Sequence, residues 1–586
     1  MGSHCDPCGL RGEIPGSDAM EQGDFTRREV LTGGLAVAGV LLSGCGTPAP
    51  AGLPLQISGG IVGDALRLGH LLRGGFEFPP ITRAERVPVV IVGGGVSGLA
   101  AAWRFHMGGF RDFTLLELEA TVGGNARSGS SPVTPYPWGA HYLPLPGPEA
   151  KAVRRLLADL GVIERFGRDG RAVYEERHLC HAPQERLFIH GRWQHGIFPH
   201  TGATDEDLAQ YAAFRKEMDR FRLWRDGAGR RAFAIPRVAG APGAFRDLDR
   251  LSMSAFLESR GWHSPRLRWY IEYACRDDFG TGLAETSAWA GVHYHASRDP
   301  DPEYGEVVLT WPQGNGWLVQ RMAEAVAGQI RSGQMVFNVE ISGGDVAVDV
   351  YSAQDRKSTR LIAREVILAC PSFVAARIYR PWKERPPSFL AAFRYAPWLV
   401  ANLHLSSAPT DGVGAPPAWD NVLYDSESLG YVVATHQSLR THPGETVWTY
   451  YRSFPGRDPS DVRRQLLVTP WASFRDEILV DLSRAHPEIP KRVQRLDVML
   501  YGHAMVRPEV GFVWGKAREW VITSLTCPVH LAHSDLSGFS LFEEAYEWGD
   551  RAAERVLMRL GRSMGRGRTG TRRPNYTARH TGPGRF

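Results

Sequence analysis

The sequence predicts an α/β fold in which a domain built on a parallel sheet is interleaved along the chain with a second, mixed α+β domain. Two observations predict the first domain. Residues 87–92 form a continuous apolar, largely β-branched run, typical of a strand buried on both faces of a sheet. A Gly-x-Gly-x-x-Gly spacing follows at once, over residues 93–98. The second domain is predicted from the length of 586 residues, since one domain usually has about 100–200.

The composition and charge exclude several classes of protein. Hydrophobic residues make up 43% of the chain and charged residues 22%, which excludes a disordered, collagenous or disulfide-framework chain. The seven cysteines are scattered and give no paired zinc spacing, so no metal site is predicted. The net charge of +5 is uneven, because residues 1–44 are acidic and residues 562–586 hold seven arginines and no acid. The body between them is nearly neutral, and no nucleic-acid partner is predicted.

The N-terminus has the pattern of an export signal. Paired Arg27 and Arg28 precede an uncharged stretch that is too short to span a bilayer, which needs about 20 apolar residues. The arginine pair resembles a Tat signal, and "LLSGC" resembles a bacterial lipobox. The resemblance implies that 1–44 is removed, that Cys45 carries a lipid as the only membrane anchor, and that the protein is periplasmic or in the cell envelope. The alternative is a short buried helix.

The segment after the apolar run has each part of a dinucleotide site. Gly93 permits a tight turn, Gly95 lets the backbone approach a pyrophosphate, and Gly98 lets the following helix pack closely on the strand. The first turn of that helix, which contains Ser97, offers free N–H groups to phosphates. A second strand at 113–116 ends in Glu117, whose carboxylate can accept ribose hydroxyl protons.

The next residues decide which dinucleotide is expected. Glu117 is followed by Gly123, Gly124, Asn125 and Arg127, a pattern that resembles the flavin-dependent amine oxidase superfamily, which includes monoamine and polyamine oxidases and phytoene-desaturase-like enzymes. The resemblance implies noncovalent FAD. Members usually carry Arg after the glycine pair, so Asn125 departs from the pattern and Arg127 is expected to supply the positive charge.

The resemblance resumes in later segments. "MVFNVEISGGDVAVDV" resembles the hairpin whose backbone binds adenine, and by register that residue is Val336. A strand at 529–532 leads to Asp535, which the resemblance places near the ribityl-pyrophosphate. A final helix starting near Phe542, with Glu544-Ala545 where members usually have Gly-Ala, is expected to direct its N-terminus at the flavin. The alternative for 529–560 is an ordinary strand, turn and amphipathic helix.

These segments give the expected domain boundaries. The segments are a signal at 1–44, a tether at 45–84, an FAD domain at 85–145, 308–380 and 495–560, a substrate domain at 146–307 and 381–494, and a disordered basic tail at 561–586. Helices are expected at 149–161 and 205–226 in the substrate domain.

The substrate site is expected to be apolar and aromatic with few polar groups. His141, Tyr142 and His503 are candidates because they fall in segments that the family brings to the flavin. Adjacent Asp277 and Asp278 are expected to point to different sides of a regular element, yet they could attract a cationic substrate. Many amine oxidases place a lysine near the position of Asn402, so Asn402 is the fourth candidate. A cage tyrosine of monoamine oxidases corresponds to Leu541 here.

The expected function is therefore hydride transfer from an amine-like small molecule, with a cationic amine as one candidate, to the flavin of an FAD-dependent oxidoreductase. Two alternatives stay open. The missing lysine and cage tyrosine favour a desaturase- or isomerase-like flavoprotein acting on an apolar substrate. The other alternative is a non-catalytic FAD-containing envelope protein that binds or assembles a partner. The sequence predicts no oligomeric state.

Overall fold

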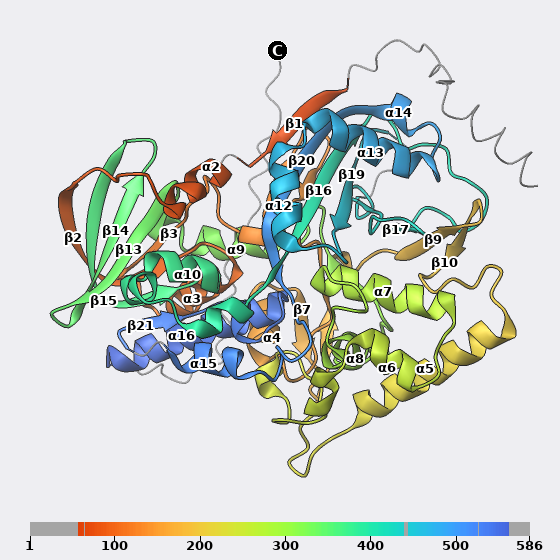
Figure 1. The fold of residues 1–586 in the computed structure, drawn as a ribbon, viewed down its shortest axis with the longest axis horizontal. Helices are drawn as coiled ribbons and strands as arrows, with labels where there is room; N and C mark the ends of the chain where they lie inside the picture. The colour runs from red at the N-terminus through yellow and green to blue at the C-terminus, as the bar shows by residue number, and fades with distance from the viewer. Residues whose placement is uncertain (1–56, 64, 439–443, 525–526, 562–586) are drawn as a thin grey trace, which may run out of the picture. The chain divides into compact units, whose positions relative to one another are not determined.

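The computed structural model describes residues 57–63, 65–438, 444–524 and 527–561 (Figure 1). The predicted export signal, the lipidated Cys45 and the basic tail from residue 562 lie outside these residues. Within the described ranges, no helix is both long and apolar enough to cross a bilayer.

One sheet of seven strands carries the predicted parallel domain. Four neighbouring pairs are parallel, with β2 and β15 at the centre, and β14 and β13 extend β15 as an antiparallel hairpin. The strands are β12 (Ile330–Arg331), β3 (Phe113–Leu116), β2 (Ile81–Val92), β15 (Lys357–Leu368), β14 (Asp345–Ser352), β13 (Gln334–Ser342) and β21 (Val529–Leu531). Val89, Val90 and Ile91 are fully buried, as the continuous apolar run predicts. The α/β class is therefore confirmed.

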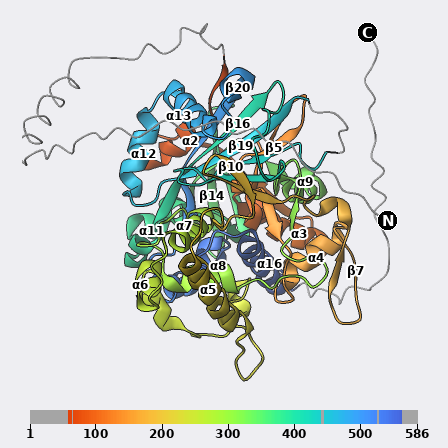
Figure 2. The same ribbon diagram turned by 90° about the vertical axis from the view of Figure 1, so that its right-hand side faces the viewer.

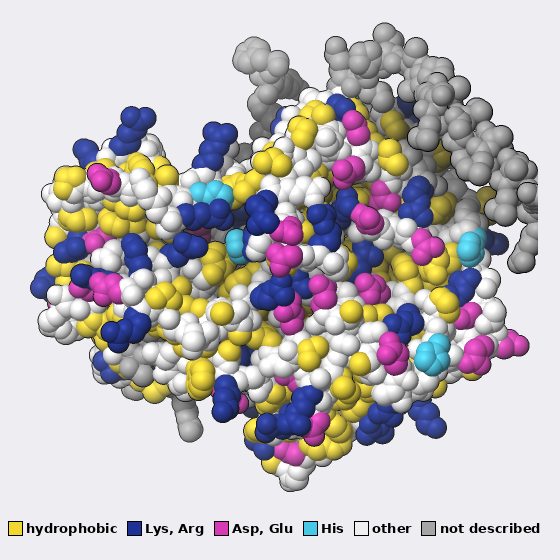
Figure 3. Space-filling view, in the orientation of Figure 1, with side chains coloured by type: hydrophobic (Ala, Val, Ile, Leu, Met, Phe, Trp, Pro, Cys, Tyr) yellow, Lys and Arg dark blue, Asp and Glu magenta, His cyan; other side chains and the backbone are white. Residues whose placement is uncertain are grey.

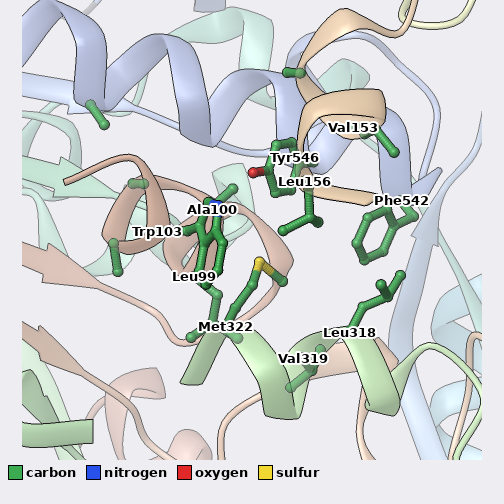
Figure 4. Packing of buried hydrophobic residues seen from close by; sticks show 14 of the residues in the cluster. Leu99, Ala100, Trp103, Val153, Leu156, Leu318, Val319, Met322, Phe542 and Tyr546 are labelled. Atoms are coloured by element: carbon green, nitrogen blue, oxygen red, sulfur yellow. The ribbon is translucent and has the colours of Figure 1, made fainter. Parts of the chain in front are cut away.

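Helices from four distant segments pack together beside this sheet (Figure 4). They are α3 (Val96–Met107), α4 (Lys151–Asp159), α9 (Gly316–Ala325) and α16 (Phe542–Arg559). Trp103 of α3, Met322 of α9 and Tyr546 of α16 belong to one buried cluster. The helices α3 and α16 approach closely at Gly549, because a Cβ there would lie 2.1 Å from the Ser97 carbonyl oxygen. The N-terminal half of α16 is thus fixed beside the first turn of α3.

A second sheet of eight strands contains most of the strands from the segments expected to form the substrate domain. Its order across the sheet is β1 (Ser58–Val62), β20 (Val493–Val506), β16 (Tyr395–Leu405), β19 (Thr446–Ser453), β18 (Tyr431–Val433), β17 (Asp420–Leu423), β9 (Glu185–Ile189) and β10 (Arg192–His195). Alternate residues of β16 belong to different clusters: Leu399, Ala401 and Leu403 pack with α12 (Pro459–Val468) and α13 (Trp471–Ser483), whereas Trp398 and Val400 pack on the other face.

A group of helices completes this domain, below the eight-stranded sheet in Figure 2. They are α5 (Asp205–Leu223), α6 (Met253–Ser259), α7 (Pro265–Phe279) and α8 (Ala288–Ala296). The helices predicted at 149–161 and 205–226 correspond to α4 and α5. Thr204 and Asp207 form a reciprocal capping box that fixes the start of α5.

Two expected boundaries differ from the structure. The described part of the predicted tether contains β1, α2 (Ala65–His70) and the start of β2. The reason is that β1 pairs in parallel with β20, where Gly59 has a φ of 137° and no room for a side chain against Leu496. Residues 495–506, expected in the FAD domain, are part of β20 and pair with β16.

Charges of both signs are interspersed over the face shown in Figure 3. Arginines and acids alternate there without a large area of one sign, in keeping with the nearly neutral body of the chain. Many of them form ion pairs on the surface, such as Arg394 with Asp458 at 2.9 Å. This face therefore has no extended field of one sign.

Candidate functional site

The first glycine loop leaves no room for side chains. Gly93 has a φ of 108°, and a Cβ there would lie 2.5 Å from the Ala369 carbonyl oxygen at the end of β15. A Cβ at Gly98 would lie 1.9 Å from the carbonyl oxygen of Gly93. The expected tight turn and close helix packing are both present, and each requires glycine.

The second glycine pair meets the first loop. The Gly123 N–H donates to the Gly94 carbonyl over 2.8 Å, and a Cβ on Gly124 would lie 3.3 Å from the Cα of Gly95. Gly95 is the N-cap of α3 and supplies no side chain to the first-turn N–H groups. The result is a helix N-terminus bordered by backbone alone, which suits a phosphate group.

Glu117 lies at the end of β3, as expected. Its carboxylate accepts the N–H of Gly94 over 2.7 Å and that of Glu119 over 2.8 Å, while burial raises the pKa of Glu117. The first residue of β13 also contacts Glu117, since the Gln334 N–H donates to the Glu117 carbonyl over 2.8 Å. The buried Val336 follows two residues later, next to a bulge in β13. The two residues expected at the adenosine end are therefore on adjoining segments.

Asp535 lies at the end of the central strands. Its Oδ2 accepts the Tyr395 hydroxyl over 2.6 Å and the Ser372 N–H over 2.8 Å, and Oδ1 is 3.0 Å from His533 Nδ1. Burial raises the pKa of Asp535, but His533 and these hydrogen bonds outweigh burial, and the net pKa is lowered. Asp535 is thus an anion whose position is fixed from three sides.

The start of α16 departs most clearly from the expected pattern, because Glu544 stands where glycine is usual. Glu544 is fully buried, and its carboxylate accepts the Arg237 N–H over 2.6 Å and the Ser537 hydroxyl. Burial raises the pKa of Glu544 to about 7. The Ala545 carbonyl accepts the Ser97 hydroxyl over 2.8 Å. The side chains of Glu544 and Ser97 therefore bind the protein itself, and only their backbone groups remain for the expected cofactor contact.

Asn125 and Arg127 also join parts of the protein. Asn125 Nδ2 donates to the Ala504 carbonyl of β20 over 2.5 Å. Arg127 Nε donates to the Gly124 carbonyl over 3.2 Å, and its Nη1 is 3.1 Å from Glu119 Oε2. These contacts hold the second glycine loop against the substrate-domain sheet.

The His141 segment lies where the two domains meet. The His141 ring stacks on Tyr451 of β19, with centroids 4.5 Å apart, and lies 5.5 Å from Trp419. Its Nδ1 is 3.2 Å from the Gly139 carbonyl, so Nδ1 carries the proton and Nε2 is an acceptor. Burial lowers the pKa of His141 to about 4. The turn before α9 fixes this segment, since Asn315 Nδ2 donates to the Tyr142 carbonyl over 2.9 Å.

Two carboxylates of α7 adjoin these aromatic rings. The Tyr142 hydroxyl donates to Asp277 Oδ2 over 3.2 Å, and the buried Asp278 Oδ2 has no hydrogen-bond partner among the described residues. Burial raises the pKa of Asp277 to about 6 and that of Asp278 to about 7, although the charge of Arg298 lowers both. Arg298 Nη2 is in turn 3.8 Å from Glu543 in the first turn of α16. The charge of Arg298 thus acts on both aspartates.

These groups form one cluster of interacting side chains. Tyr142, Asp277 and Arg298 are half-buried rather than buried, so part of each side chain remains accessible. Burial is nevertheless the largest influence on the pKa of each group. We call the site formed by His141, Tyr142, Asp277, Asp278, Arg298, Trp419 and Tyr451 the acidic chamber.

Two of the predicted catalytic residues, His503 and Asn402, lie outside the acidic chamber. His503 stacks on Phe373, with centroids 4.4 Å apart, and has no contact with His141 among the described interactions. Burial, reinforced by nearby arginines, lowers its pKa to about 4. Asn402 is fully buried; its Nδ2 donates to the Pro137 carbonyl over 3.1 Å and its Oδ1 accepts the Thr449 hydroxyl. The pairing of His141 with His503 is therefore not observed, and Asn402 links β16 to neighbouring segments.

Tyr451, Trp419 and Arg298 are not predicted from the sequence. They come from strands and loops without a motif, and only the fold brings them to His141 and Asp277. The described residues also contain no cluster of three or more groups that could hold a metal ion.

Comparisons with known proteins agree with this architecture. A family model described as an NAD(P)-binding Rossmann-like domain matches residues 91–160. A putrescine oxidase structure with bound putrescine has a TM-score of 0.55 at 17% identity, covering 81% of this chain and 100% of that chain. Cyclohexylamine oxidase from Brevibacterium oxydans IH-35A has a TM-score of 0.55 at 15% identity, covering 81% of this chain and 100% of that chain. The fold is that of FAD-dependent amine oxidases.

A protein named for a different activity also shares this fold. A CLA-producing fatty acid isomerase from P. acnes has a TM-score of 0.54 at 14% identity, covering 81% of this chain and 98% of that chain. No curated protein sequence matches this chain. At these identities the likeness establishes the fold.

The residues of this amine-oxidase fold suit an FAD molecule. The loop glycines form a cradle that any Cβ would fill, the N-terminus of α3 has no side-chain cap, and Glu117 ends β3. Asp535 adds a fixed anion after β21, at the carboxyl ends of the same parallel strands. Glycines 93, 95, 98, 123 and 124 would border the pyrophosphate by backbone alone.

Proposed function

We propose that this protein is an FAD-dependent oxidoreductase that oxidises the C–N bond of an amine-like substrate and binds its FAD noncovalently. FAD held by the backbone of the two glycine loops would supply the acceptor for the hydride equivalent that leaves the substrate carbon. The observation that carries the proposal is the acidic chamber, in which Asp277 and Asp278 adjoin the aromatic rings of His141, Tyr142 and Tyr451.

The chamber suits a cation better than a neutral molecule. The carboxylates of Asp277, Asp278 and Glu543 act on the single guanidinium of Arg298. When all three acids are ionised, these four side chains together carry a net negative charge. Aromatic faces add attraction for an ammonium group. An alkylammonium could pair with Asp278 Oδ2, which has no hydrogen-bond partner among the described residues.

His141 and Tyr142 have distinct roles in this proposal. The lowered pKa keeps the His141 ring neutral at pH 7, so its Nε2 accepts a hydrogen bond from a substrate N–H. The Tyr142 hydroxyl orients the Asp277 carboxylate towards the chamber. The enclosing rings of Tyr451 and Trp419 exclude water from the reacting atoms.

The direct experiment starts from the purified protein. Flavin absorption at about 375 and 450 nm is expected. Noncovalent binding predicts that acid precipitation releases all the FAD into the supernatant. A panel of mono-, di- and polyamines is expected to include a substrate that yields peroxide or reduces an artificial electron acceptor. Absence of flavin absorption from protein expressed with excess riboflavin would refute the proposal.

One observation favours a second candidate, an isomerase- or desaturase-like flavoprotein acting on an apolar substrate. The polar atoms of Asn402, at the expected lysine position, are hydrogen-bonded within the protein. Conversion of polyunsaturated fatty acids or polyenes without any response to amines would support this candidate. If neither class reacts while FAD is bound, the protein is instead a non-catalytic binding or assembly factor.

We also propose that the protein reaches the cell envelope by the Tat route and is anchored through a lipid on Cys45. The support is the Arg27-Arg28 pair and the lipobox-like sequence before Cys45. Labelled fatty acid should be incorporated into the wild type and not into Cys45→Ala. Replacing both arginines by lysine should leave the protein in the cytoplasm, and unchanged export of that variant would contradict the proposal.

A further inference from the structure

A second cavity lies outside the acidic chamber, between η4 (Arg237–Ala239), α15 (Lys516–Ser524) and α16. Its volume is about 190 Å³. Three tryptophans and two arginines dominate its lining: Trp289, Trp514, Trp548, Arg237 and Arg518. We call this cavity the arginine–tryptophan pocket.

The two arginines converge on one backbone carbonyl. Arg237 Nη2 donates to the Val513 carbonyl over 3.0 Å, and Arg518 Nε donates to the same oxygen over 2.6 Å. Arg518 Nη1 donates to the Leu536 carbonyl over 3.1 Å. Within the described part of the chain, the hydrogen bonds of both guanidinium groups go to backbone carbonyls, and the buried Arg237 Nε has no partner. Two adjacent cations thus share neutral acceptors.

The nearest acids are engaged elsewhere. Glu544 accepts the backbone N–H of Arg237 and the Ser537 hydroxyl, and its raised pKa of about 7 leaves it partly protonated at neutral pH. Asp249 accepts the Ser287 hydroxyl over 2.6 Å and the Trp514 N–H over 2.8 Å. Burial lowers the pKa of Arg518 to about 10, and burial together with Arg518 lowers that of Arg237. An oxyanion in the pocket would offset this unfavourable pair of charges.

The walls define the rest of the ligand. The Arg237 guanidinium lies 4.2 Å from the ring centroid of Trp514 and 5.6 Å from that of Trp289. Trp548 Nε1 is already bonded to Ser537 Oγ over 2.7 Å, so its ring contributes an apolar surface. The cavity could hold about six waters at roughly 30 Å³ each, which suits one small ring and excludes a dinucleotide.

We propose that the arginine–tryptophan pocket binds a small organic carboxylate, with the carboxylate paired to Arg237 and Arg518 and the apolar body packed among Trp289, Trp514 and Trp548. This binding does not depend on the amine chemistry of the acidic chamber. The residues that line the pocket are separate from those of the acidic chamber.

Calorimetric titration of the FAD-containing protein with benzoate tests the proposal. Benzamide, which has the same ring and no charge, should bind at least about tenfold more weakly. Arg518→Met should weaken benzoate binding about tenfold or more. The matched control is Lys516→Met, which removes an exposed charge from the same helix and should leave affinity within twofold. Asp277→Asn should also leave benzoate affinity unchanged.

A further variant covers the possibility that Arg518→Met does not fold, since Arg518 satisfies two carbonyls. Arg237→Lys keeps a cation, loses the forked geometry, and should weaken benzoate binding several-fold while the melting temperature stays near that of the wild type. Benzoate should raise the melting temperature of the wild type and quench its tryptophan emission, with less quenching in Trp514→Phe.

Four results would overturn the proposal. They are no benzoate binding to the wild type, equal binding of benzamide, affinity unaffected by both arginine substitutions, and competition between benzoate and an amine substrate for one site. Inorganic phosphate that binds as tightly as benzoate would also overturn it, because the tryptophan walls would then contribute nothing. Benzoate binding and its response to the arginine substitutions are measured without any amine and do not depend on amine turnover, so the two proposals fail independently.

Discussion

The Tyr142 hydroxyl donates a hydrogen bond to the Asp277 carboxylate over 3.2 Å, joining the strand β6 (Tyr142–Pro144) to the helix α7. Residues 142 and 277 are far apart in sequence, and no motif predicts the contact. It brings an acid to the aromatic rings around His141 and gives the chamber its preference for cations.

Replacing Asp277 by asparagine should mainly weaken amine binding. The amide keeps the volume and the hydrogen bond from Tyr142 but removes the charge, which is worth about 1.5–3 kcal/mol for a charged hydrogen bond. The expected result is an amine KM raised about tenfold or more with FAD content unchanged. Asp219→Asn, an exposed acid of α5, is the control and should not alter KM. An unchanged KM in Asp277→Asn would remove the residue from the site.

Amine binding should strengthen as the pH rises from 5 to 8. The pKa values of Asp277 and Asp278 are raised to about 6 and about 7, so both carboxylates are neutral at pH 5 and ionised at pH 8. Alkylamines remain protonated throughout this range, so KM should fall as the acids ionise. The profile of Asp278→Asn should move to lower pH, because Asp277 loses a neighbouring charge. A flat profile in the wild type would contradict the assignment.

Gly98→Ala should disrupt the dinucleotide cradle. The added Cβ would lie 1.9 Å from the Gly93 carbonyl oxygen, so α3 must shift away from the loop. We expect a loss of about 1–3 kcal/mol in the free energy of unfolding and a large loss of bound FAD. Gly328→Ala is the control, because a Cβ there contacts nothing within 4 Å. Full FAD occupancy in Gly98→Ala would show that the loop does not bind the cofactor.

The buried carboxyl of Glu544 should make stability depend on pH. Its pKa in the folded state is raised to about 7, so the folded protein favours the protonated form. The stability associated with that proton is present below the unfolded pKa and is lost as the pH rises through about 7. Glu544→Gln should therefore gain stability relative to the wild type between pH 5 and pH 8 in denaturant titrations. An equal difference at both pH values would contradict this account.

Local patterns predict the dinucleotide half of the fold well. The apolar run, the glycine spacing and Glu117 lie consecutively, so β2, α3 and β3 follow from short-range rules, and α16 begins at Phe542 as expected. The substrate side depends on long-range pairing. Nothing near Ser58 predicts that it pairs with Arg495, and nothing near Tyr451 predicts that it stacks on His141.

The same reason explains the candidates that the structure separates. His141 and His503 are both on segments at the domain interface, but His503 stacks on Phe373. Register alone cannot give the direction of a side chain that β20 and α10 (Ser372–Ile378) jointly enclose. Asn402 likewise lies at the expected position in β16, and its contacts come from Pro137 and Thr449.

Anaerobic reduction of the purified protein by amines tests the central claim most directly. The absorption at about 450 nm should bleach on addition of a cationic amine, at a rate that saturates with concentration, and should return when air or an artificial acceptor is admitted. Asp277→Asn should need about tenfold more amine for half the limiting rate. Flavin that stays oxidised with every amine, yet responds to an apolar unsaturated substrate, would contradict the claim.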